Sequence, residues 1–451
     1  MRWLVSAVLT LGASAGCGDN LAPRGEFEIV GHSDLGARGM NSAMAIAGDI
    51  AYVGSRTDSK PVLIVDIKDP ANPHVVGEIG MPAEALSSMS SRELRATTDP
   101  PYLFVLNLQC SPDLHGCAST GGEVENIRQF DISNPLAPLP LGTHSVTGGP
   151  LRRRSPHEFF LWQDPNNHER TFLLVAAPGI PSLELVAATP AGPNLAIQYD
   201  PYAEGGVPRT LGEDDILHSV SASDDGRTLY LSHQVAGLFI ADVSSVIDQG
   251  EMPKIEMLTT ADAAVKFGVM GPHSAVPVPA RKLLALTEEI YPAPFGAGCP
   301  WGWVRLVDIA NPAAPVQVGE YKLPENDPGC AVDGPRITFT SHNLTATSHV
   351  ALATWYAGGL QAIDISDPTA PFQLAEFRPD PLVSVMAEDP GLGGSKVEMW
   401  SYPIIKDGLI YVIDSRNGLY VLRYRGLWGE EIAQRTFLEG NSNIGAFLPR
   451  R

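Results

Sequence analysis

The chain has 451 residues, 44 glycines, 39 prolines and a formal net charge of −20 at pH 7. This charge argues against nucleic-acid binding, because a phosphate backbone requires Lys and Arg to displace its counterions. It suits the solubility of an exported protein instead. By length alone the chain has room for two or three domains, but its many glycines and prolines are typical of a turn-rich all-β protein.

The N-terminus has the composition of a secretory signal. Arg2 is followed by an apolar stretch at residues 3–11 and then by small residues. One positive charge, a short apolar core and small residues predict a signal peptide over residues 1–17, and the apolar run is too short to span a bilayer. Residues 18–26 are interpreted as a linker.

Cys17 follows the small pair Ala15-Gly16 and resembles the lipobox cysteine of bacterial lipoproteins. Ser14 departs from that pattern, which prefers Leu. The resemblance implies cleavage at Cys17 and its acylation, so that a lipid anchor is the only membrane contact of a periplasmic or cell-surface protein. The alternative is plain export with cleavage near Ala15.

Five stretches of the chain repeat one pattern, in which an apolar strand ends in Asp and, in four of them, leads into a Pro-x-x-Pro turn. They are residues 63–73, 130–138, 239–244 (diverged), 306–315 and 362–371. An Asp carboxylate can cap such a turn, and each Pro restricts the backbone that follows. Self-similarity at this spacing predicts a repeat architecture.

Two further strand-like runs precede each repeat. Residues 219–222 and 228–231, for example, flank an Asp-Asp-Gly hairpin turn. Four strands in about 40 to 60 residues predict a propeller blade with loop insertions. Seven inner hairpins are recognisable, with second strands near residues 51–53, 103–105, 173–175, 229–231, 284–286, 351–353 and 410–412. The third blade has the weakest pattern, since residues 178–201 lack the Asp-Pro signature.

The last blade lacks a fourth strand after residues 418–422, whereas residues 27–32 look like a fourth strand without a blade. We therefore expect an all-β, seven-bladed β-propeller over residues 27–426, in which the N-terminal strand completes the last blade and removes an open sheet edge. A closed ring of this kind is expected to be a monomer. Residues 427–451 are predicted to pack along the outside of the ring, with a helical turn near residues 430–435.

The Asp-x-x-[Asn/Asp]-Pro-x-x-Pro core resembles the LVIVD-repeat family of bacterial cell-surface β-propellers. The resemblance covers roughly residues 27–426. It implies the propeller fold and a surface location, and it says little about chemistry.

Besides Cys17, the chain has four cysteines, and an even number in an exported protein predicts disulfides. The predicted pairs are Cys110–Cys117, within one insertion, and Cys299–Cys330, whose loops are expected on the same face of the ring. The alternative is a zinc or thiolate site.

Four histidines occupy one repeat position, at the start of the innermost strand in each of the third to sixth blades. They are His157, His218, His273 and His342, and the same position holds Ser42, Arg92 and Trp400 in the other three blades. Because inner strands run along the propeller axis, these side chains are expected to converge at one mouth of the channel. Loops that open on the same face carry His233, Glu288, Glu289 and Trp355, and three carboxylates are close to ring positions (Glu93, Glu158 and Glu398).

Two interpretations of these histidines stay open. In the structural one, each imidazole donates to a carbonyl of the neighbouring blade and joins adjacent inner strands. In the functional one, the imidazoles bind a metal ion, for which a His-rich site with few carboxylates favours copper or zinc. Glu158 would then orient the ligating imidazoles without binding the ion itself.

The histidines of the inner strands also have a distant, local similarity to the selenium-binding protein/methanethiol oxidase propellers, at His218, His273 and His342. The resemblance implies a copper-type histidine site, but a fold-level analogy does not transfer an activity.

Two functions follow as hypotheses. The first is an anchored surface module that presents its top-face loops, including the insertions at 106–126 and 290–303, to a protein, glycan or small molecule. The alternative is a metal-dependent oxidoreductase acting on a small molecule. In it, the four ring histidines bind copper or zinc, Arg92 holds an anionic group, and Glu288 or Glu289 moves protons.

Overall fold

The computed structural model describes residues 25–80, 89–110, 112–117, 125–146, 156–177, 182–208, 216–249, 253–268, 270–292, 298–326 and 333–445. The predicted signal peptide, Cys17 and Cys330 lie outside these residues. Among the described helices, the longest of which is α3 (Gly429–Ala433), none is long and apolar enough to cross a membrane.

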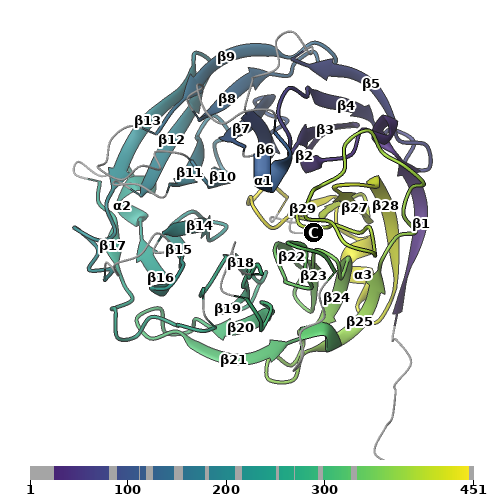
Figure 1. Cartoon of the computed structure of the whole chain (residues 1–451). Coiled ribbons are helices and arrows are strands. Elements are labelled where there is room, and N and C mark those ends of the chain that lie inside the picture. Colours follow the sequence, from purple (N-terminus) through teal and green to yellow (C-terminus); the bar gives the residue numbers. More distant parts are fainter. Residues whose placement is uncertain are drawn as a thin grey trace, which may run out of the picture.

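Seven antiparallel sheets surround a central channel, which confirms the predicted seven-bladed β-propeller (Figure 1). From the channel outward, blades 1 to 3 consist of β2 (Asn41–Ala47), β3 (Ile50–Ser55), β4 (Val62–Asp66) and β5 (His74–Ile79); β6 (Met89–Ala96), β7 (Tyr102–Gln109), β8 (Asn126–Asp131) and β9 (Leu139–His144); and β10 (Glu158–Gln163), β11 (Thr171–Ala176), β12 (Leu183–Thr189) and β13 (Gly192–Tyr199). All seven predicted second strands lie in the second strand of a blade, and the weakly patterned third blade is a complete four-stranded sheet.

The remaining blades follow the same order around the ring. Blades 4 to 6 consist of β14 (Leu217–Ala222), β15 (Thr228–His233), β16 (Gly237–Asp242) and β17 (Glu256–Met257); β18 (Ser274–Pro277), β19 (Leu283–Thr287), β20 (Val304–Asp308) and β21 (Val316–Tyr321); and β22 (Leu344–Ala346), β23 (Val350–Thr354), β24 (Leu360–Asp364) and β25 (Phe372–Phe377). Blade 7 contains β26 (Ile404–Lys406), β27 (Leu409–Asp414) and β28 (Gly418–Gly426). The short helices α1 (Pro112–His115), α2 (Ser244–Ile247), η1 (Leu35–Ala37) and η2 (Pro324–Asn326) lie in the connections.

The Asp of the repeat caps its turn as the pattern predicts. In blade 1 the Asp66 carboxylate accepts a hydrogen bond from the backbone N–H of Lys68 at 2.8 Å. Asp131, Asp242, Asp308 and Asp364 accept from the amide two residues ahead in the same way. The recurring signature is therefore a local hydrogen bond that fixes the turn after the third strand.

The inner strands of each blade are buried on both faces, because neighbouring blades pack against each other. Between blades 1 and 2, for example, Ile64 contacts the cluster that contains Leu94 and Val105. The outer strand β5, by contrast, is largely exposed. The propeller core is thus a series of interfaces between blades, formed by apolar side chains that stand on both sides of each sheet.

The N-terminal strand closes the ring as predicted. Strand β1 (Gly25–Ser33) pairs antiparallel with β28, with Phe27 opposite Tyr424, and so provides the outer strand of blade 7. This pairing joins residues far apart in the sequence and gives blade 7 the fourth, outer strand that β28 would otherwise lack.

The predicted course of the C-terminal segment is wrong. After α3 at the expected helical turn, the chain enters the channel, where strand β29 (Phe437–Glu439) adds to the inner edge of β26 (Figure 1). Residues 441–443 then pair with β10 in blade 3: the Leu161 N–H donates to the Asn441 carbonyl, and the Asn443 N–H donates to the Leu161 carbonyl. The segment follows the axis because the free inner edges of β26 and β10 offer it backbone hydrogen bonds, whereas the outer edge of blade 7 is already occupied by β1.

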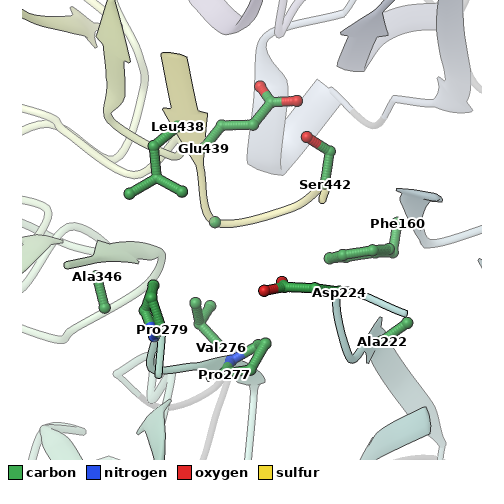
Figure 2. A pocket seen from close by; sticks show the side chains of 11 residues that line it. Phe160, Ala222, Asp224, Val276, Pro277, Pro279, Ala346, Leu438, Glu439 and Ser442 are labelled. Carbon is green, nitrogen blue, oxygen red and sulfur yellow. The ribbon is translucent and has the colours of Figure 1, made fainter. Parts of the chain in front are cut away.

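The C-terminal segment fills much of the channel at the end where the inner strands finish. A space of about 20 Å³ remains between it and the inner strands of blades 3 to 6. Figure 2 shows Leu438 and Ser442 on one side of this space and Asp224 and Pro277 on the other. The C-terminal segment therefore lies across the channel at the end opposite the start of the histidine-bearing strands.

The predicted disulfide Cys110–Cys117 is present and closes the insertion after β7. Cys299 is also disulfide-bonded, but its predicted partner Cys330 lies outside the described residues.

Candidate functional site

The four ring histidines lie where the sequence pattern places them, at the start of the inner strands of blades 3 to 6. His157 directly precedes β10, His218 is the second residue of β14, His273 directly precedes β18, and His342 stands two residues before β22. Each strand begins at the same end of the channel because every blade repeats the same hairpin order. His218, His273 and His342 are at most 5% exposed, and His157 is half-buried.

The imidazoles form a continuous arc. The Nε2 atoms of His157 and His218 are 2.8 Å apart, a hydrogen-bond distance that requires a hydrogen on one of the two nitrogens. The ring centroids of His218 and His273 are 4.1 Å apart, and those of His273 and His342 are also 4.1 Å apart. The blades therefore bring together side chains from positions 157 to 342 of the chain.

Backbone carbonyls of the next blade orient two of the rings. His218 Nδ1 donates to the His273 carbonyl at 3.1 Å, and His342 Nδ1 donates to the Trp400 carbonyl at 2.7 Å. In blade 5 the Thr287 hydroxyl, 3.5 Å from His273 Nδ1, donates to the His342 carbonyl. The structural interpretation therefore holds for Nδ1 of His218 and His342, whose Nε2 atoms then carry no hydrogen and can accept a hydrogen bond or bind a metal ion.

The Nε2 atoms of His273 and His342 are buried and make no hydrogen bond of good geometry. Their nearest carboxylate is Glu289, whose Oε2 is 3.5 Å from His273 Nε2 and whose Oε1 is 3.2 Å from His342 Nε2. Ligand atoms of His218, His273 and Glu289 all lie within 4.8 Å of one another. This His/Glu cluster is able to hold a metal ion.

The protonation states favour ligation. Burial, followed by the charge that a neighbouring imidazole would carry, lowers the pKa of His218 and His273 well below the usual value, so both rings are neutral near pH 7. Burial opposes ionisation of Glu289, but interactions with His342, His273 and His218 outweigh it and hold the pKa of this carboxyl well below its usual range. His218 and His273 therefore offer neutral nitrogens, and Glu289 offers a carboxylate.

Two tyrosines help to hold the Glu289 carboxylate, and the ring of one of them, Tyr356, packs against His342. The Tyr356 hydroxyl donates to Glu289 Oε1 at 2.5 Å, and the Tyr291 hydroxyl lies 2.6 Å from that of Tyr356. Burial, followed by the charge of Glu289, raises the pKa of both phenols, so they stay protonated and available as donors. Nothing in the repeat pattern marks these two tyrosines, so they could not be recognised from the sequence.

The other predicted site residues divide between the cluster and its surroundings. Arg92 lines the small cavity formed by the four histidines, and its guanidinium carbon lies 5.6 Å from the ring centroid of Trp400. Glu288 is fully buried in an ion pair with Arg305 at 2.7 Å. Of the two adjacent glutamates, the structure thus brings Glu289 to the histidines and pairs Glu288 with an arginine.

The base of the cluster is built by Glu158 and the C-terminal segment. Glu158 Oε2 is 3.9 Å from His218 Nδ1, while its Oε1 accepts from the Tyr402 hydroxyl at 2.8 Å and from Asn441 Nδ2 at 3.2 Å. Burial, followed by the charge of Glu93, raises the pKa of Glu158 to about 8. Asn441 was missed in the sequence because the segment that carries it was expected outside the ring.

The free space inside the cluster is small. The cavity holds about 10 Å³ and is lined by Arg92, Glu93, His157, Glu158, His218, His273, His342 and Asn343. This is about the space that one water molecule needs. The arrangement therefore accommodates an ion or a similarly small species, whereas an organic substrate does not fit in this conformation.

The LVIVD repeat model matches residues 38–79, 302–322 and 355–376, which belong to blades 1, 5 and 6. No curated protein matches the sequence.

Solved structures with a similar fold include Chaetomium thermophilum Sqt1, with 15% identity, 86% of each chain covered and a TM-score of 0.46. The Cps50 (Swd1) β-propeller domain of Myceliophteria thermophila has 11% identity, covers 85% of this chain and 96% of its own, and has a TM-score of 0.46. A Bacteroides uniformis protein assigned as a 6-phosphogluconolactonase has 10% identity, with 72% and 81% of the two chains covered and a TM-score of 0.45. The shared pattern and the observed sheets show that this chain is a seven-bladed β-propeller that carries LVIVD repeats.

Proposed function

We propose that this propeller is an exported metal-binding protein that holds one transition-metal ion, copper or zinc, at the cluster of His218, His273 and Glu289, with His157 and His342 flanking it in the same arc of imidazoles. The observation that carries the proposal is that the buried Nε2 atoms of His273 and His342 make no hydrogen bond of good geometry and instead face the Glu289 carboxylate at 3.5 and 3.2 Å. A buried polar atom without a partner is rare in a native protein and is expected to have an ion or water beside it. Imidazole ligands with a single carboxylate favour copper or zinc over the hard cations.

The surroundings of the cluster support the same proposal. Carbonyl and carboxylate partners orient ligating histidines in known metal sites, and here the His273 and Trp400 carbonyls take that role. The cavity of about 10 Å³ supports storage, transport or sensing of an ion over conversion of an organic molecule. Oxidoreductase activity on a small molecule stays a prediction, as does the binding of a protein or glycan at the top-face loops.

Elemental analysis of untagged protein tests the metal site. The proposal expects about one equivalent of copper or zinc per chain after purification without added chelator, or after loading and extensive dialysis. A metal content far below one equivalent under both conditions would contradict it.

We also propose that the protein is exported and anchored by a lipid on Cys17, on the strength of the signal-like N-terminus. Expression of the full chain in a bacterium should give protein in the membrane fraction that incorporates labelled fatty acid. The Cys17→Ser variant should lose the label and move to the soluble exported fraction, because the thiol that receives the lipid is gone. Equal membrane association of the two forms would refute the anchor, and retention of both in the cytoplasm would refute export.

A further inference from the structure

A second set of metal-binding side chains lies outside the histidine cluster. Asp58, in the connection between β3 and β4, stands beside the disulfide of Cys110 and Cys117, and ligand atoms of the three residues all lie within 4.8 Å of one another. Asp58 is 8% exposed, Cys110 1% and Cys117 4%. Blades 1 and 2 therefore bring one carboxylate and two sulfurs together in a buried position.

The backbone around this cluster is held by hydrogen bonds that do not depend on the disulfide. Cys110 directly follows β7, which pairs with both of its neighbours in blade 2. In the insertion, the Gly116 N–H donates to the Pro112 carbonyl at 3.0 Å. In blade 1, the Ser55 hydroxyl donates to the carbonyl of Thr57, the residue before Asp58, at 3.0 Å. The three side chains are therefore expected to stay close together when the S–S bond is broken.

The charge around the insertion favours thiolates over thiols. His115 lies between the two cysteines in the sequence and is buried. Burial, followed by the positive charges of Arg56, Arg92 and Arg336, lowers the pKa of this imidazole to about 2. Cationic neighbours that oppose protonation of an imidazole also stabilise a thiolate. These surroundings suit an anionic set of two thiolates and one carboxylate.

Thiolates are soft ligands that select ions such as zinc, and zinc also accepts a carboxylate oxygen. The thiolate, and not the disulfide sulfur, is the metal ligand. We propose that Cys110, Cys117 and Asp58 bind one zinc ion when the disulfide is reduced and release it when the disulfide forms. Three protein ligands are the number found in zinc sites that keep one position open. This site goes beyond the proposed function, because it uses none of the four histidines.

The switch is a two-electron reaction. A dithiol reductant gives two electrons and two protons to the protein: the S–S bond between Cys110 and Cys117 breaks, both residues become thiols, and the reductant becomes a disulfide. When the ion binds, the two thiols release their protons to the solvent. A disulfide oxidant reverses the switch by accepting the two electrons, so that the S–S bond forms again and the ion leaves.

Cobalt(II) spectroscopy on the full chain tests the proposal. Cobalt(II) can replace zinc, and sulfur ligands give it an intense charge-transfer band in the near ultraviolet that imidazole and carboxylate ligands do not. A water-soluble phosphine reduces the disulfide, takes up oxygen from water as the phosphine oxide, and adds no competing thiol. Reduced wild-type protein should show the band and oxidised protein should not. Cobalt at the histidine cluster contributes no such band, so the two sites succeed or fail separately.

Three variants assign the band to its ligands. Cys110→Ser/Cys117→Ser keeps Cys299 and should lose the band. Asp58→Asn should keep the band and raise the dissociation constant for cobalt at least about 10-fold, since even an outer partner of a metal ligand is worth that much. Asp49→Asn is the matched control, because it removes a carboxylate that is 58% exposed from the first hairpin of the same blade. Its dissociation constant should equal that of the wild type.

A reduced, folded wild-type protein without the band would overturn the proposal and leave the histidine cluster untouched. Unfolding on reduction, followed by near-ultraviolet circular dichroism, would overturn it as well. A band that persists in the double serine variant would come from other cysteines and would also count against the site. An unchanged dissociation constant in Asp58→Asn would overturn the role of Asp58. If that variant does not fold, the spectra of the wild type and the double serine variant still decide the proposal.

Discussion

His273→Ala is expected to raise the dissociation constant for copper or zinc by at least about 100-fold. Removing an outer partner of a metal ligand already lowers affinity about 10- to 100-fold, and His273 offers its Nε2 to the cluster directly. The ring is fully buried at the centre of the arc, between His218 and His342. Isothermal titration or competition with a chromophoric chelator measures the change.

His273 is the most informative histidine to replace because its own backbone carbonyl, which an alanine keeps, orients the neighbouring His218. The His273 carbonyl accepts the hydrogen bond from His218 Nδ1, and an alanine still provides that carbonyl. The orientation of His218 should therefore survive. The control is His74→Ala, which removes an imidazole from the exposed start of the outer strand β5 and should leave metal affinity unchanged.

Metal binding should also appear in the stability of the folded protein. An ion that binds only the native state at a concentration 1,000 times its dissociation constant adds about 4 kcal/mol to the free energy of unfolding. Wild-type protein should lose this increment with a chelator, whereas His273→Ala should barely respond. If the variant responds as strongly as the wild type, or the wild type does not respond at all, the four-histidine site is not where the metal binds.

Loss of the C-terminal segment from the channel is expected to have the largest effect on stability. Leu438 in β29 is 5% exposed and packs in the cluster that contains Ile405, Ile410 and Val412. Leu438→Ala should lower the free energy of unfolding by about 2–5 kcal/mol, as for other buried leucines. Truncation after Thr436 should lower it further, because it also removes the hydrogen bonds of residues 441–443 to blade 3. Urea denaturation measures both changes.

Leu427→Ala is the matched control, since this leucine stands in the same C-terminal region and is 41% exposed. It should change the free energy of unfolding by less than about 0.5 kcal/mol. The truncated chain should also bind metal about 10- to 100-fold more weakly, because Asn441 no longer donates to Glu158. Equal stability of the full and truncated chains would show that the segment does not occupy the channel in solution.

The predicted and observed sites differ at residues whose partners are far away in sequence. Glu288 and Glu289 are adjacent, and both were candidates, but neighbouring side chains in an extended chain point in opposite directions. Only the packing of blade 5 decides that Glu289 faces His273 while Glu288 meets Arg305. Tyr356 was not recognised because its importance comes from its contact with Glu289 of the neighbouring blade and not from a repeated position.

The sequence by itself determined the blades, the closing strand and the positions of the four histidines. These features arise from local interactions, such as the hydrogen bond that the Lys68 amide donates to the Asp66 carboxylate, which repeat wherever the same residues recur. The tertiary structure alone decided that the C-terminal segment enters the channel and that Asn441 meets Glu158, 283 residues away. No local pattern encodes that contact, because it depends on which inner strand edges stay free after seven blades have closed into a ring.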